Sequence, residues 1–330
     1  MGLCGLALAW HRAAPVLGPT ATAVAFAISL VMLAVAVALA AGSAARAWRF
    51  PAAWREDWLH PVRHVFIATI PISLLLIVTV AVALLGPAPW LAVLWWVGSL
   101  AQLAITVAVL GRWWHGGPSA EPAAGKPAGP SWSGLTPALF IPVVGNVVAP
   151  LAGVPLGFVE WSLAQFAIGA FFWPVVLTLV AVRLFIAGAL PERLLPTAFI
   201  AVAPPAVSGL SLMQFGAPQA VVWTMWGVAL FFLLWAATLA GRIVRLPFAI
   251  PHWAMSFPLA AFAGLTLRIA DASGSATGGF SSLALAALAL ATLVIAALFV
   301  ATIRGLRNAS LLVAESTPAA AAPRPAPVGD

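Results

Sequence analysis

Residues 65–111 read VFIATIPISLLLIVTVAVALLGPAPWLAVLWWVGSLAQLAITVAVLG and contain no aspartate, glutamate, lysine, arginine or histidine. A membrane-spanning helix needs about 20 apolar residues, so this stretch is long enough for two spans joined by the turn at 86–89. Residues 194–241 are equally free of charge and predict a second such pair. Over the whole chain 63% of residues are hydrophobic and 7% are charged, against about a quarter charged in ordinary soluble domains. The sequence therefore predicts an all-α integral membrane protein.

Apolar runs between charged and turn residues predict the number of spans. Nine full spans follow residue 18, with approximate limits 20–44, 62–85, 88–111, 135–153, 157–183, 194–214, 218–241, 251–270 and 281–303. Residues 1–13 are also apolar but too short to span. A completed first segment would bring the number to about ten.

The connections alternate between charge-free turns and basic links. The turns at 86–89, 153–157 and 215–218 carry no charge. Of the fifteen lysines and arginines, all but Arg12 and Arg268 fall in the other connections or the C-terminal tail. Basic loops mark the cytoplasmic face, so we expect a multi-pass protein of the bacterial cytoplasmic (inner) membrane with its C-terminus in the cytoplasm. The net charge of +7 then needs no nucleic-acid partner.

Proline recurs in four successive hairpins, in the middle of the first helix of each, with Pro150 and Pro205 as further prolines in two of them. The positions are Pro71, Pro142, Pro204 and Pro258. Proline removes a backbone donor and bends a helix, and in lipid the freed carbonyl must be satisfied by protein or water. We therefore expect the proline-kinked helices to form an inner ring facing a cavity, surrounded by straighter outer helices.

Ionisable side chains are absent from the interior of every predicted span. Proton relays need such groups at membrane depth, and enzymes need acids, bases or metal ligands. Cys4 is the single cysteine, and His60 and His64 fall in a basic connection. We expect no catalytic residue, no metal and no cofactor, and we expect that the protein is not an enzyme.

Mild polar residues lie close to the inner-ring prolines, among them Asn146 and Ser256. Such residues either join helices by hydrogen bonds or line a pore, and both interpretations remain open. Phe257 immediately precedes Pro258, where helical backbone is disfavoured. Its ring either packs in the protein interior or blocks a narrow pore.

Four segments resemble the tellurite-resistance/C4-dicarboxylate transporter family, which includes the slow-type anion channels of plants. They are FIPVVGN at 140–146, LPERLLPT at 190–197, APP at 203–205 and WAMSFPL at 253–259. The resemblance implies ten helices in five hairpins with the kinked helices around a central pore, in a homotrimer. It also implies that Phe257 plugs the pore, and that Phe140 and Phe199 line it.

The same resemblance bears on how the chain is divided. Residues 1–13 are similar to the second half of the family's first helix, so we expect that helix to be N-terminally truncated here. We expect residues 1–315 to form a single transmembrane transport domain. Within it, the Pro-, Gly- and Ala-rich segment 116–133 is expected to be a flexible cytoplasmic linker, and 316–330 a disordered tail.

The function implied by the resemblance is a passive anion channel or channel-like exporter for small inorganic or organic anions, embedded in the lipid bilayer. With no charged side chain in the spans, we expect selectivity to come from pore diameter and from backbone dipoles at broken helices. The alternative is a secondary carrier or efflux protein for C4-dicarboxylates, sulfite or tellurium oxyanions. A membrane-embedded enzyme or cofactor-binding protein is a third class, which coloured purified protein would support.

Overall fold

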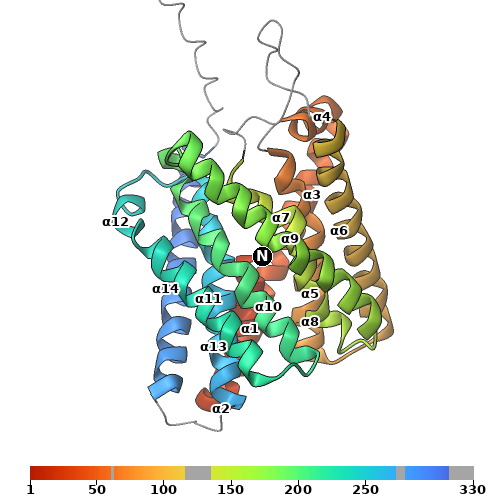
Figure 1. The fold of residues 1–330 in the computed structure, drawn as a ribbon, viewed down its shortest axis with the longest axis vertical. Helices are drawn as coiled ribbons and strands as arrows, with labels where there is room; N and C mark the ends of the chain where they lie inside the picture. The colour runs from red at the N-terminus through yellow and green to blue at the C-terminus, as the bar shows by residue number, and fades with distance from the viewer. Residues whose placement is uncertain (61–62, 116–134, 273–278, 312–330) are drawn as a thin grey trace, which may run out of the picture.

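The structure is a computed structural model that describes residues 1–60, 63–115, 135–272 and 279–311. The chain forms successive hairpins, each an inner segment followed by an outer helix (Figure 1). The outer helices are α3 (Pro19–Arg49), α6 (Pro89–His115), α9 (Val159–Ala187), α11 (Gln219–Ala237) and α14 (Gly279–Arg307). The predicted linker 116–133 and tail 316–330 lie outside the described residues.

Most inner segments begin as a 3₁₀ helix and continue as an α-helix. They are α1 (Gly2–Arg12), η1 (Arg63–Ala68) with α5 (Thr69–Leu85), η3 (Pro137–Leu139) with α7 (Phe140–Val144), η4 (Gly145–Val148) and α8 (Pro150–Gly153), η5 (Glu192–Val202) with α10 (Ala203–Gln214), and η6 (Ile250–Met255) with α13 (Ser256–Ala272). Three short helices lie in connections, namely α2 (Ala14–Leu17), α4 (Pro51–Leu59) and α12 (Ala240–Ile243).

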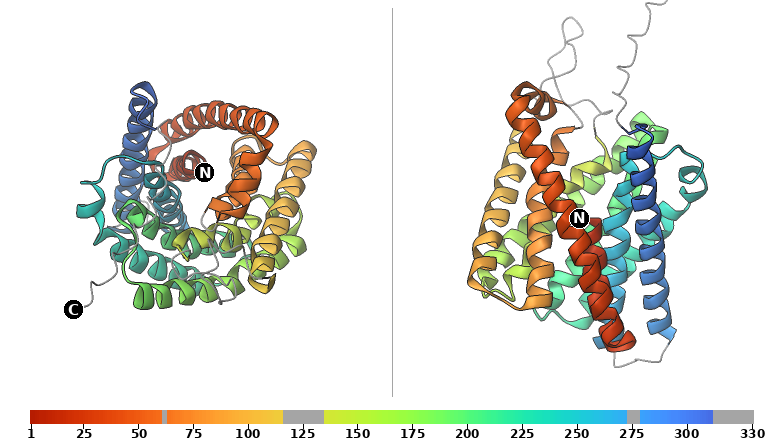
Figure 2. Two further views of the ribbon diagram at one scale, coloured as in Figure 1. Left: turned by 90° about the horizontal axis from the view of Figure 1, so that it is seen from above. Right: turned by 180° about the vertical axis from the view of Figure 1, so that it is seen from behind.

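The inner segments close into a ring. α1 packs against α5, α5 against α8 and η4, these against α10, α10 against α13, and α13 back against α1. Figure 2 shows α1 lying inside the curve of the surrounding outer helices. The buried share of the most apolar stretch is 50%, 83% and 72% for the inner segments 63–85, 192–214 and 250–272, but only 11% to 33% for the outer helices. Two concentric layers are thus present, as the proline pattern predicted.

Eight of the described helices are long and apolar enough to span a membrane. The segment Pro137–Gly153 is apolar but shorter, and α1 has 11 residues. The predicted all-α membrane architecture is confirmed, whereas the number of ten spanning helices is not. Several outer helices run beyond their predicted limits, for example α3 to Arg49 and α9 to Ala187. Hydropathy marks the lipid-facing part of a helix, not the turns that continue past it.

The inner prolines mark where 3₁₀ helix gives way to α-helix. The third residue of four inner α segments is a proline, namely Pro71 in α5, Pro142 in α7, Pro205 in α10 and Pro258 in α13. Pro204 is the second residue of α10. Amide groups in the first turn of an α-helix have no partner within that helix, so proline there costs no hydrogen bond. η5 runs for 11 residues, well beyond the usual length of about 3–4 residues for 3₁₀ structure.

The third inner segment is the most broken, and side chains from neighbouring helices satisfy its backbone. Pro142 O accepts hydrogen bonds from Gln102 Nε2 at 2.9 Å and Thr106 Oγ1 at 2.7 Å. Trp95 Nε1 donates to Ala149 O at 2.9 Å. In lipid each unpaired carbonyl costs several kcal/mol, so these bonds from α6 allow the segment to break.

Asn146 extends this arrangement into a buried network. Its Nδ2 donates to Thr106 Oγ1 and to Val143 O, both at 2.8 Å, and its Oδ1 accepts from Gln165 Nε2 at 3.0 Å. Gln165 Oε1 in turn accepts from Ser99 Oγ at 2.6 Å. We call Ser99, Thr106, Asn146 and Gln165 the polar staple, because it ties the inner segment to both α6 and α9.

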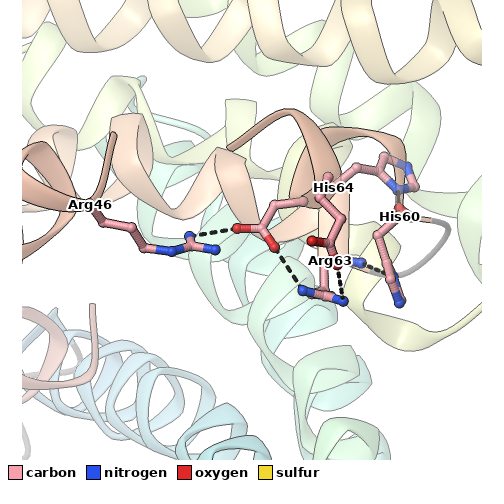
Figure 3. A network of polar contacts seen from close by, with 6 residues as sticks. Arg46, His60, Arg63 and His64 are labelled. Atoms are coloured by element: carbon pink, nitrogen blue, oxygen red, sulfur yellow. Dashed lines mark hydrogen bonds and ion pairs between the residues drawn. The ribbon is translucent and has the colours of Figure 1, made fainter. Parts of the chain in front are cut away.

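A second polar network joins α3, α4 and η1 (Figure 3). It lies at the end of the bundle that carries α4 and the arginine-rich end of α14, which is here called the basic end (Figure 1). Asp57 of α4 binds Arg46 of α3 at 2.6 Å and Arg63 of η1 at 2.9 Å. Arg63 also reaches Glu56 at 3.2 Å. The carboxylate of Asp57 therefore joins three consecutive elements. The opposite end, with the short turns at 86–88, 154–158 and 215–218, is called the turn end.

Asp57→Asn is expected to lower the thermal midpoint of the purified protein at pH 7, by the equivalent of about 1 kcal/mol because the pair is partly exposed to solvent. Partial burial raises the pKa of Asp57, but the hydrogen bonds and charges of Arg46 and Arg63 outweigh it and hold the pKa below its usual value. A carboxylate with a lowered pKa stabilises the folded state above about pH 4 and loses that effect as pH falls through the folded pKa. The difference between wild type and variant should therefore shrink below about pH 4. Glu56→Gln, at an exposed position, is the control with the smaller effect. A difference that persists unchanged at low pH would contradict this account.

The polar staple predicts energetic coupling between Asn146 and Gln165. A double-mutant cycle of Asn146→Ala and Gln165→Ala is expected to give a coupling of about 0.6 kcal/mol, and at most about 1.7 kcal/mol, in reversible unfolding in micelles. Thr178→Ala is the matched control, because the Thr178 hydroxyl donates to Pro174 O of its own helix. Combined with Asn146→Ala in the same kind of cycle, it should give no coupling. Additive effects of Asn146→Ala and Gln165→Ala would show that the network does not tie the two layers together.

Candidate functional site

The contact between α1 and α13 closes the inner ring and contains Phe257. Phe257 is half-buried and is the second residue of α13. A Cβ placed on Gly5 of α1 would lie 3.2 Å from Phe257 Cδ2 and 3.6 Å from Cε2. Glycine at position 5 therefore leaves the space against which the ring packs. The backbone break lies at Met255, where η6 ends, so Phe257 itself is helical.

Ser256 lies at the same contact. It is buried, and its Oγ donates to Trp253 O at 2.6 Å. The hydroxyl also abuts Gly2 of α1, where a Cβ would collide with it. Ser256 thus faces α1, with its proton already bonded to the backbone of the preceding η6.

Phe140 and Phe199 are both buried in the described structure, at 2% and 6% exposed. Phe140 is the first residue of α7 and shares one apolar cluster with Phe257. Phe199 lies in η5 and belongs to a second cluster, which includes Leu6 of α1 and Leu259 of α13. The three phenylalanines all come from inner segments, but they are divided between two clusters.

Asn146 is hydrogen-bonded between helices. It is fully buried, and its side chain bonds to α6, to α9 and to the backbone of its own segment. These contacts direct the amide toward the outer helices. These bonds are of the helix-joining kind, one of the two roles that the sequence left open for Asn146.

Two arginines near helix ends turn toward the protein interior. A Cβ placed on Gly264, near the middle of α13, would lie 2.6 Å from Arg12 Nη1. Arg183 in α9 is only 4% exposed and donates to Gly188 O at 2.6 Å. Both residues lie near the ends of their helices, as the sequence predicted. Side chains on a helix point toward its N-terminus, which for Arg12 is the direction of the ring interior. The signal that was missed is the glycine seven residues after Phe257.

Comparison with known proteins identifies the architecture. The SLAC1 family model, described as voltage-dependent anion channel, matches residues 1–303. The S-type anion channel SLAH2 of Arabidopsis thaliana is 26% identical over 224 residues, which is 67% of this chain and 41% of that protein. The S-type anion channel SLAH3 of the same plant is 26% identical over 223 residues, which is 67% of this chain and 33% of that protein. The matched region thus spans less than half of either relative.

The family match covers every inner segment and every outer helix, apart from the last residues of α14. It agrees with the apolar, multi-pass helical bundle and confirms the resemblance to slow-type anion channels. The chain is a multi-pass integral membrane protein that belongs to the voltage-dependent anion channel family.

Proposed function

We propose that the protein conducts small anions passively through the inner ring, and that the side chain of Phe257 plugs this pathway. The observation that carries the proposal is the position of Phe257: a half-buried ring from α13, seated against Gly5 of α1 where the inner ring closes. A large apolar ring in a narrow passage blocks it and repels water. The family and the names of the two relatives supply the substrate class.

The kinds of polar side chain that are buried in the bundle favour passive conduction over proton-coupled transport. The buried polar side chains of the described residues are hydroxyls, amides, Arg183 and His252, with no aspartate or glutamate among them. Carriers that move protons rely on carboxylates or histidines at membrane depth, and His252 lies in η6 with its ring bonded to the Ala249 backbone. A secondary carrier for C4-dicarboxylates, sulfite or tellurium oxyanions remains the alternative that the flux experiment below separates.

Assembly and orientation are part of the same proposal. The outer helices expose large apolar side chains, such as Leu39, Phe171 and Leu293 at 67%, 68% and 69%, which suits contact with lipid or with further copies of the chain. We propose a homotrimer in a bacterial inner membrane, with a pathway in each subunit. The basic end would face the cytoplasm, following the distribution of arginines.

Phe257→Ala is expected to raise chloride and nitrate flux in proteoliposomes by at least about tenfold, which corresponds to a barrier lowered by about 1.4 kcal/mol. The current should rise with anion concentration without saturating. Phe26→Ala is the matched control, because Phe26 is exposed on the outer helix α3 and its ring does not reach the pathway.

A different outcome of the same flux experiment would favour the carrier alternative. If the wild type takes up an organic or oxyanion substrate in a saturable, gradient-coupled way, and Phe257→Ala passes no current, the carrier alternative replaces the channel. Phe257 would then have a packing role only.

A further inference from the structure

The contact between α1 and α13 contains two close approaches of the same kind. At the first, Gly5 of α1 makes room for Phe257 of α13, and at the second, Gly264 of α13 makes room for Arg12 of α1. Gly5 and Arg12 are seven positions apart on α1, and Phe257 and Gly264 are seven positions apart on α13. Seven residues return an α-helix to the same face within about 20° and advance it by about 10 Å. Arg12 therefore lies on the same side of the contact as Phe257, about two turns nearer the turn end.

The guanidinium of Arg12 has no counter-charge. It makes no ion pair and no hydrogen bond with the residues that the structure describes, where the ion pairs are those of Arg46, Arg63 and Arg242. The charged side chain that acts on Arg12 is Arg268, one turn beyond Gly264 on α13, and it is also positive. Enclosing a charge without a partner is costly. Two neighbouring cations without a counter-charge favour an anion.

The surroundings at this level support the same conclusion. His11, next to Arg12, has a buried Nδ1 without a hydrogen-bond partner among the described residues. Arg12 as a whole residue is half-buried. Arg268 is exposed. An anion arriving from the turn end would therefore meet Arg268 first and Arg12 second.

We propose that Arg12, with Arg268 beside it, forms a binding station for the permeating monovalent anion on the turn-end side of Phe257. This inference rests on the proposed channel function and names a charged group within the pathway, which the sequence did not lead us to expect. Gly264 belongs to the station because any side chain there would occupy the space of the guanidinium. Partial exposure keeps binding weak, and conduction requires an anion site that also releases its ion.

The test is made on the Phe257→Ala background, with reversal potentials measured in a potassium chloride gradient across phosphatidylcholine bilayers. Arg12→Gln is expected to lower the ratio of chloride to potassium permeability by about tenfold, as for loss of one hydrogen bond to a charged group. Arg12→Lys should keep most of the preference, and Arg268→Gln should cause a smaller loss that disappears at high salt. Arg307→Gln at the exposed end of α14 is the control without effect. An unchanged permeability ratio in Arg12→Gln would overturn the proposal.

A second measurement does not depend on conduction, so it separates this inference from the channel proposal. The thermal midpoint in detergent is compared with chloride and with gluconate at equal ionic strength. Chloride should raise the midpoint of the wild type and of Arg12→Lys, but not that of Arg12→Gln. If Phe257→Ala passes no current and chloride still stabilises through Arg12, the channel proposal fails and the anion site stands. A midpoint of the wild type that responds to phosphatidylglycerol but not to chloride would assign Arg12 to a lipid phosphate and contradict the inference.

Discussion

A backbone carbonyl that has lost its helical partner must find another one when the surrounding solvent is lipid. The fold of this protein depends on that constraint. Four inner segments change from 3₁₀ to α-helix near a proline. The segment 137–153 breaks a second time at Pro150. Side chains of α6 then bond to Pro142 O and Ala149 O, and the polar staple extends the same role to α9. The two layers are therefore interdependent at this segment, where the outer helices supply the bonds that allow the inner backbone to break.

Where α1 meets α13, shape complementarity takes the place of hydrogen bonds. Each helix offers one glycine to one large side chain of the other, at a spacing of seven residues. The two large side chains are a phenyl ring and a guanidinium, one suited to exclude water and the other to attract an anion. The proposed plug and the proposed anion site thus share a single packing pattern, which would let a pathway with few charges favour anions.

The sequence predicted the architecture well, because hydropathy and arginine distribution act over whole helices. The predicted spans 62–85 and 251–270 correspond to the described segments 63–85 and 250–272. The site was less accessible to prediction. Asn146 has the same polarity whether it faces a pore or a neighbouring helix, and its bonds to Thr106 and Gln165 are visible only in the structure. Arg12 followed a short apolar segment and was assigned to a span end, because the direction of a side chain cannot be read from hydropathy.

The central claim is that the side of α13 carrying Phe257 faces a water-accessible pathway across the bilayer. The most direct measurement places single cysteines in a Cys4→Ala background, at Phe257→Cys on that side and at Phe26→Cys on the outer helix α3, and treats each with a water-soluble, negatively charged thiol reagent. The account predicts that Cys at 257 reacts from the aqueous phase and that its modification stops anion flux, whereas the same treatment at 26 leaves flux unchanged. An unreactive thiol at 257 in a protein that still conducts would place the pathway elsewhere and contradict the account.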